Sequence, residues 1–379
     1  MKESIVETKQ DRVSKRKRSI MQQSGFTLVE LLVVIAIIAL LMGILLPSLN
    51  KARQTAYCAK TGGNLHNVGI AMETFSADYG SYPASYMYPK DATVDDVKSI
   101  MCNQDETHPF GYVHWSWFLF ESGRVDASAF TCPAIKGGGC PRTNPGKKLS
   151  DWEKGQQDQT SSSGPNPLLQ DKQAPRMAFT ANAAVIPRNK FACDDTTNQY
   201  PRHNRLVNPT EIQRPAEVIL LTEFNEDWQA IEAVDSTSNV LVSKSHRPIL
   251  PFSHSGTGYA GYAVYQAAKD QTRYEYGTGY NTANVSWGLK SLADISDPSF
   301  HYVDGENGHQ LNAVGRHHPG TWKATTGGAD GGTDKDMGGT TMFLYCDGHV
   351  ERKTILETIQ KLEWGKKFYS VTGDQLVFY

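Results

Sequence analysis

An apolar run near the N-terminus constrains this chain more than any other feature. Sixteen consecutive apolar or small residues, 31–46, follow the segment 24–30, which reads Ser-Gly-Phe-Thr-Leu-Val-Glu. Four consecutive basic residues, 15–18, precede both segments. As a helix, residues 26–46 would extend about 31 Å, enough to cross the hydrocarbon core of a bilayer. The sequence therefore predicts one membrane span, with the basic side in the cytoplasm and the rest of the chain beyond the membrane.

Glu30 is the only charged residue between positions 26 and 46. A carboxylate in an apolar span is costly unless it is partnered or protonated, and a simple anchor gains nothing from it. An ordinary secretory signal would be cut after the apolar run, where Pro47-Ser48-Leu49 offers no cleavage site made of small residues. An uncleaved anchor, with Glu30 tolerated near the interface, stays the alternative.

The Gly25-Phe26 junction, the acid at position 30 and the apolar run closely resemble the N-terminal signature of type IV pilins and type II secretion pseudopilins. The resemblance implies a basic leader, residues 1–25, which a prepilin peptidase removes before Phe26 is N-methylated. It also implies that Glu30, then the fifth mature residue, meets the Phe26 amine of a neighbouring subunit during assembly. Pro47 stands where the family often carries proline. Without an N–H, Pro47 would kink, loosen or end the helix at the membrane exit.

The sequence predicts that this helix continues outside the membrane over residues 47–80, because apolar residues recur there at steps of three and four. These are Ala52, Ala56, Ala59, Leu65, Val68, Ala71, Met72 and Phe75. Gly62-Gly63 would weaken the middle of the helix, and Gly80 would stop it. We expect residues 81–379 to form an exported head. The fold predicted is α+β: a long N-terminal helix, transmembrane in its first half, packed on an antiparallel sheet with long inserted loops. A loop-rich surface insertion is expected at about 136–176.

The C-terminal region predicts a hairpin, with a strand over 341–346, a tight turn at Asp347-Gly348 and a return strand from His349. This region resembles a C-terminal motif of pseudopilin-like proteins, in which a histidine precedes a strand that ends in Asp-Gly-His. The motif residues here would be His318, or His317, with Asp347 and Gly348. The 28 residues between His318 and Asp347 exceed the spacing usual in that group. Further strands are expected at 217–224 and near 375–379, and a short helix near 354–363.

The six cysteines, Cys58, Cys102, Cys132, Cys140, Cys193 and Cys346, all follow the predicted span. An exported domain meets an oxidising compartment, so up to three disulfides could form. Cys132 and Cys140 are the best candidate pair, because seven residues separate them and three are glycine. Free buried thiols are the alternative.

The sequence contains two groups of possible metal ligands, and a metal site is predicted at neither. Asp330, Asp334 and Asp336 lie in a glycine-rich loop that could hold calcium, but their spacing fits no EF-hand, and a solvated loop is favoured. Histidines 301, 309, 317, 318 and 349 are dense enough to suggest zinc, yet no HExxH pattern is present. No other cofactor is expected.

The chain carries neither a nucleophile-elbow nor a phosphate-binding motif, so no enzyme is predicted. Carboxylates such as Glu223 and Glu226 have no spacing that singles them out as a glycosidase pair. The charge balance, 38 basic against 40 acidic residues, does not suggest nucleic acid. The resemblance implies a structural subunit of the inner membrane. Its head would be periplasmic and its partners would be prepilin peptidase and other pilin or pseudopilin subunits in a secretion pseudopilus or pilus-like filament. The alternative is a tethered binding module whose aromatic-rich head captures a polysaccharide or an exported protein.

Overall fold

The computed structural model of the 379-residue chain describes fifteen stretches of it. These are residues 27–90, 96–102, 104, 111–157, 170–188, 204–227, 232–234, 241–249, 251, 253–254, 274–275, 289–296, 310–326, 333–371 and 377–378. The predicted leader, the Gly25-Phe26 junction, Cys193, His301, His309 and Asp330 lie outside them. The chain forms two compact units, Met1–Lys51 and Ala52–Tyr379.

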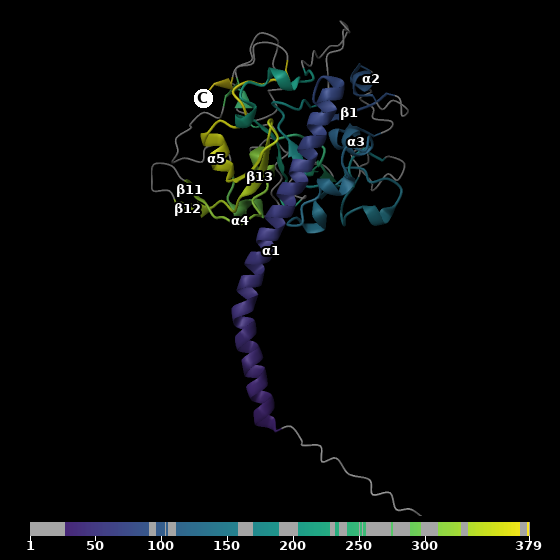
Figure 1. Ribbon diagram of the computed structural model, residues 1–379. Coiled ribbons are helices and arrows are strands. Elements are labelled where there is room, and N and C mark those ends of the chain that lie inside the picture. Colours follow the sequence, from purple (N-terminus) through teal and green to yellow (C-terminus); the bar gives the residue numbers. More distant parts are fainter. Residues whose placement is uncertain are drawn as a thin grey trace, which may run out of the picture. The chain divides into compact units, whose positions relative to one another are not determined.

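The longest element is helix α1, Leu28–Tyr79, with 52 residues (Figure 1). It begins with a capping box: Thr27 Oγ1 accepts a hydrogen bond from the Glu30 amide at 3.3 Å, and Glu30 Oε2 accepts one from the Thr27 amide at 2.9 Å. It ends at Gly80, whose φ of 75° is the left-handed conformation that glycine tolerates best, so the predicted end is confirmed. The helix continues through Pro47 and Gly62-Gly63. The predicted continuation of the helix past Pro47 is confirmed, and the alternative of a helix end at this residue is wrong, because losing one backbone hydrogen bond does not stop the helix there.

The two parts of α1 differ in what surrounds their side chains. In the first unit, every large apolar side chain from Leu28 to Leu46 exposes at least 43% of its surface. In the second unit, the helix buries a stripe at steps of three and four: Cys58, Thr61, Asn64, Leu65, Val68, Gly69, Ala71, Met72, Phe75 and Ser76. Ala52, Ala56 and Ala59 are exposed. The spacing of apolar residues therefore predicted the helix correctly, but it did not predict which side chains are buried at these three positions.

The main sheet has four antiparallel strands in the order β14-β13-β6-β5. The strands are β5 Phe179–Ala181, β6 Ile219–Glu223, β13 Thr341–Tyr345 and β14 Val350–Lys353. The predicted strands at 217–224 and 341–346 are confirmed, and so is the Asp347-Gly348 turn, where Gly348 has a φ of 88°. The predicted α+β fold, a long helix followed by a head of antiparallel sheets, is confirmed.

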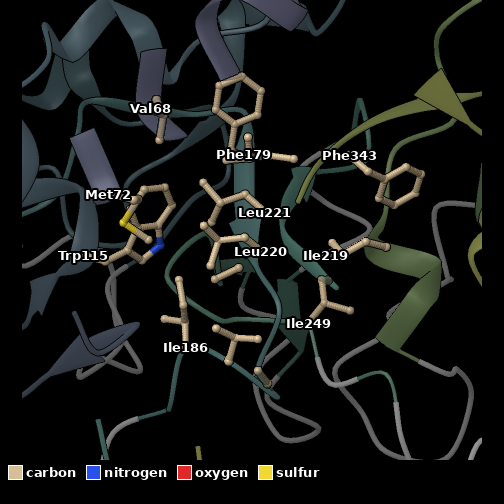
Figure 2. Packing of buried hydrophobic residues seen from close by; sticks show 14 of the residues in the cluster. Val68, Met72, Trp115, Phe179, Ile186, Ile219, Leu220, Leu221, Ile249 and Phe343 are labelled. Carbon is tan, nitrogen blue, oxygen red and sulfur yellow. The ribbon is translucent and has the colours of Figure 1, made fainter. Parts of the chain in front are cut away.

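Side chains cover both faces of the main sheet. Leu344 of β13 lies opposite Leu221 of β6, and α1 packs on this face with Gly69 directly against Leu344. On the other face, Phe343 packs edge-on against Trp364 with ring centroids 6.1 Å apart. Figure 2 shows Val68 and Met72 of α1 in the same cluster as the β6 and β13 side chains. All residues of β6 and β13 are therefore buried.

The remaining elements are short. The helices are α2 Val97–Cys102, α3 Trp115–Phe120, α4 Leu292–Ile295 and α5 Ile355–Gln360. Four pairs of strands are antiparallel: β1 Tyr86–Met87 with β2 Val113–His114, β3 Cys140–Pro141 with β4 Arg176–Met177, β7 Glu232–Val234 with β8 Leu241–Ser243, and β11 Lys323–Thr326 with β12 Thr333–Asp336. A three-stranded sheet joins β9 Ser253–His254, β10 Tyr274–Glu275 and β15 Val377–Phe378.

The predicted helix near 354–363 is α5, and the predicted terminal strand is β15. The predicted surface insertion at 136–176 differs in one respect. Its described residues, 136–157 and 170–176, hold little regular structure, yet Thr143, Asn144 and Asp171 are buried within the head. Polarity predicted a surface position for these residues, whereas their hydrogen bonds allow burial: Asp171 Oδ2 accepts from the Asn144 amide at 2.8 Å.

Candidate functional site

The first candidate site is the start of α1. Glu30 Oε2 accepts hydrogen bonds from the Thr27 amide at 2.9 Å and from Thr27 Oγ1 at 2.7 Å. Among the residues that the structure describes, Oε1 has no hydrogen-bond partner. One oxygen of Glu30 thus fixes the start of its own helix, and the side chain is exposed. Within the same described stretches, α1 is the one helix long and apolar enough to cross a membrane.

Comparison with known families identifies this segment. Residues 20–46 match the prokaryotic N-terminal methylation motif. The chain therefore carries a prepilin-type signature, the signature of pilin- and pseudopilin-type substrates of a prepilin peptidase. The match covers the predicted Gly25-Phe26 junction, Glu30 and the whole predicted membrane span, residues 26–46. No curated protein and no solved structure matches the chain.

The second candidate site is a buried cluster in the head. Cys132, Glu223, His317 and His318 each offer one ligand atom, and these atoms all lie within 4.8 Å of one another. Cys132 follows a 3-10 turn, Ala127–Phe130, and Glu223 is the last residue of β6. The two histidines lie in the loop between a second 3-10 turn, Gln310–Ala313, and β11. The cluster thus joins three segments that are far apart in the sequence.

Glu223 is the centre of this cluster. Its Oε1 is 2.9 Å from His317 Nε2 and 3.0 Å from His318 Nε2. Cys132 Sγ is 3.7 Å from His317 Nε2. The side chains of His317, His318 and Glu223 are 6%, 1% and 0% exposed, so water does not compete for these contacts.

The electrostatics follow from burial and from mutual contact. Burial opposes ionisation of Glu223, but the two histidines outweigh burial and hold the pKa of its carboxyl well below the usual range. Burial likewise opposes the charge on His318, yet hydrogen bonding to Cys132 and Glu223 raises its pKa to about 9. Burial raises the pKa of the Cys132 thiol, whereas the hydrogen bonds with both histidines lower it. Together the hydrogen bonds have the larger effect, so the pKa of this thiol is lowered. The cluster is therefore a set of buried, mutually stabilised charges.

Neighbouring groups fix the donor atoms of the cluster. Glu223 Oε2 accepts hydrogen bonds from the Met342 amide at 2.7 Å and from Thr341 Oγ1 at 3.0 Å. His318 Nδ1 lies 3.3 Å from Cys58 Sγ of α1. A Cβ on Gly315 would come within 2.6 Å of His317 Cε1, so glycine at 315 leaves the space that this ring occupies.

The structure separates several residues that the sequence grouped. The predicted Cys132–Cys140 disulfide is not formed, and both are buried free thiols. Cys132 contacts His317, whereas Cys140 lies in β3 opposite Met177. The residues of the predicted C-terminal motif also make separate contacts. His318 contacts Glu223, whereas Asp347 Oδ1 contacts His349 Nδ1 at 2.5 Å.

Of the three aspartates considered for calcium, the structure describes Asp334 and Asp336. Asp334 and Asp336 lie exposed in β12, and Asp336 Oδ1 accepts a hydrogen bond from the Gly338 amide at 2.9 Å. Glu223 was noted in the sequence only as one of many carboxylates. The signal that could have singled it out is an acid inside an apolar strand, since an acid at a core position needs a buried partner.

Proposed function

We propose that the chain is a structural subunit of a type II secretion pseudopilus or a type IV pilus-like filament. In this proposal a prepilin peptidase removes residues 1–25 and Phe26 is methylated. Before assembly the subunit is a single-pass protein of the inner membrane, with its head in the periplasm. It acts as a building unit rather than as an enzyme.

One observation carries the proposal: the methylation motif leads directly into a helix that leaves its apolar side chains uncovered over 28–46. A surface of this extent needs a bilayer around it, or helices of the same kind. The bilayer would cover this apolar surface before assembly, and the helices of neighbouring subunits would cover it in the filament. Because helices packed in a filament exclude both water and lipid, their burial would drive assembly.

Glu30 would set the register of assembly. Its Oε2 accepts hydrogen bonds from Thr27 of its own subunit, and in this proposal Oε1 would pair with the methylated amine of a neighbouring Phe26. In an apolar surrounding, an amine and a carboxylate attract strongly only when they meet, so a misplaced subunit would leave both charges unpaired.

The test is intact mass and N-terminal peptide sequencing of the membrane-extracted protein, from cells with and without prepilin peptidase. We expect a chain that starts at methylated Phe26 only when the peptidase is present. Gly25→Val should block cleavage, whereas Ser24→Ala, one position further from the bond, should be processed normally. A chain that keeps Met1 in the presence of the peptidase, or one that starts after Leu46, would overturn the proposal.

A further inference from the structure

We propose that Cys132, Glu223, His317 and His318 bind one zinc ion inside the head. This inference is independent of filament assembly, because a head that binds zinc could sit on any N-terminal segment. Its failure and the failure of the proposed function can therefore be told apart.

The donor set selects the metal. One thiolate, one carboxylate and two imidazoles are the ligands that zinc accepts in proteins. Two anionic and two neutral donors together neutralise a divalent cation. A thiolate and imidazoles among the donors disfavour calcium and magnesium, which prefer a shell made wholly of oxygen atoms.

The spacing of the donors also fits zinc. Ligand atoms on a tetrahedral zinc ion stand about 3.3–3.7 Å apart, given metal–ligand bonds of ~2.0–2.3 Å. Cys132 Sγ and His317 Nε2 are already 3.7 Å apart. The two histidine nitrogens lie 2.9 Å and 3.0 Å from Glu223 Oε1, so each needs to withdraw by less than about 1 Å for an ion to enter.

The surrounding contacts prepare each donor for a metal. Glu223 Oε2 accepts hydrogen bonds from the Met342 amide and Thr341 Oγ1 and lies 2.9 Å from His318 Nε2. These contacts orient the carboxylate so that Oε1, which is 2.9 Å from His317 Nε2, could bind the ion. His318 Nδ1 has Cys58 Sγ at 3.3 Å. A histidine that binds metal through one nitrogen usually donates its other N–H to a neighbouring group, so this contact orients the His318 ring.

The second ring nitrogen of His317 faces a second carboxylate. Its Nδ1 and the Glu226 Oε2 atom face each other at 3.6 Å, and both are buried without a hydrogen-bond partner. Zinc at Nε2 would place the proton of His317 on Nδ1, directed at Glu226. A shift of a few tenths of an ångström would then complete a carboxylate–histidine–zinc arrangement and satisfy both orphaned atoms.

The site would be structural rather than catalytic. All four donor residues belong to the protein, and the least buried of their side chains, His317, is 6% exposed, so no position is left open for a substrate. The ion would connect segments separated by 94 and 185 residues. It would also reach α1 indirectly, since Thr61 Oγ1 lies 3.1 Å from Cys132 Sγ.

The first test is the metal content of the full chain, purified in detergent and analysed by inductively coupled plasma mass spectrometry. We expect about one zinc ion per chain in the wild type. Cys132→Ala and His317→Ala should lose it. Cys140→Ala, a buried thiol outside the cluster, and His349→Ala, an exposed histidine, should keep it. Wild-type protein that holds copper, another metal or none after growth with added zinc would overturn the proposal.

The second test does not depend on the variants folding. The wild type, stripped with a chelator, is titrated with Co²⁺, a spectroscopic substitute for zinc. We expect a thiolate-to-cobalt charge-transfer band and tetrahedral d–d bands that zinc displaces, together with a higher Tm on addition of zinc. Octahedral cobalt without the thiolate band, or no change in Tm, would show that the cluster is only a set of buried charges. Cys140→Ala should give the same spectrum as the wild type.

Discussion

Gly69, in the head-facing part of α1, lies directly against Leu344 in β13. A Cβ built at Gly69 would stand 2.9 Å from Leu344 Cδ1 and 3.0 Å from Cδ2. Leu344 is fully buried, so its methyl groups cannot easily move aside. This contact sets how closely the helix approaches the sheet.

Substitution of Gly69 should therefore destabilise the head. Gly69→Val should lower the free energy of unfolding by about 1–3 kcal/mol through overpacking. The control is Gly63→Ala on the same helix, where no atom lies within 4 Å of the added Cβ. That change should raise stability by about 0.5–1 kcal/mol, because alanine favours the helix. Chemical denaturation of the two variants is the measurement, and equal effects would show that Leu344 does not limit the helix.

The two roles of Glu30 can be separated. Glutamine keeps the capping box with Thr27 but has no charge, whereas leucine removes both. If the charge pairs with a neighbouring amine, Glu30→Gln should assemble as poorly as Glu30→Leu, although its helix start is intact. Filament recovery and subunit cross-linking report assembly. Normal assembly of Glu30→Gln would instead assign Glu30 to capping alone.

The head should lose stability below about pH 6.5, partly through His246. Its Nδ1 lies 3.0 Å from Thr143 Oγ1, which itself donates to the Ser243 carbonyl, so Nδ1 carries the proton and Nε2 is left buried without a partner. Burial, followed by the charges of Lys244 and Arg247, lowers the pKa of His246 well below 6.5.

Below pH 6.5 the imidazole of His246 binds a proton in the unfolded chain but stays neutral in the folded head. Stability should therefore fall by about 1.4 kcal/mol per pH unit from this histidine alone. His246→Phe keeps the ring packing on Tyr86 and Tyr112 and should reduce that slope by one proton. Tyr112→Phe, in the same cluster, should leave the slope unchanged. Urea unfolding between pH 5 and 8 measures it, and an unaltered slope in His246→Phe would contradict the assignment.

A buried ion pair next to β13 gives a further prediction. Lys353 Nζ lies 2.7 Å from Glu363 Oε1, and Tyr345 donates to Glu363 Oε2 at 2.6 Å. Lys353→Met should cost about 3–5 kcal/mol, because it leaves the Glu363 charge buried and unpaired. Lys353→Met combined with Glu363→Leu should cost less than Lys353→Met alone. A double-mutant cycle based on unfolding energies decides this, and additive effects would show that the pair is not coupled.

Local signals in the sequence predicted the elements that local interactions specify. The apolar run, Gly80 and the Asp347-Gly348 turn each act on neighbouring residues, so α1 and the β13–β14 hairpin followed from them. The helix also continues through Pro47, as predicted, because a single missing N–H does not end a helix that the residues on either side support.

The cluster could not be predicted in the same way. Cys132 was paired with Cys140 because the two are close in the sequence, whereas its actual neighbour His317 is 185 residues away. Glu223 meets the histidines only because the register of β6 against β13 turns it toward them. Contacts of this kind depend on the complete fold, and no spacing in the sequence encodes them.

The position of β13 also bears on how the head folds. His66 of α1 contacts the carbonyl of Gly348, just after β13, at 3.0 Å across a separation of 282 residues. In the proposed export, the head-facing part of α1 would cross the membrane before the strands that cover it. The α1 stripe around Val68 and Met72 would then stay in water until almost the whole chain has crossed. Such long-range closure is slow and exposed to aggregation, so the head should depend on a periplasmic chaperone during export.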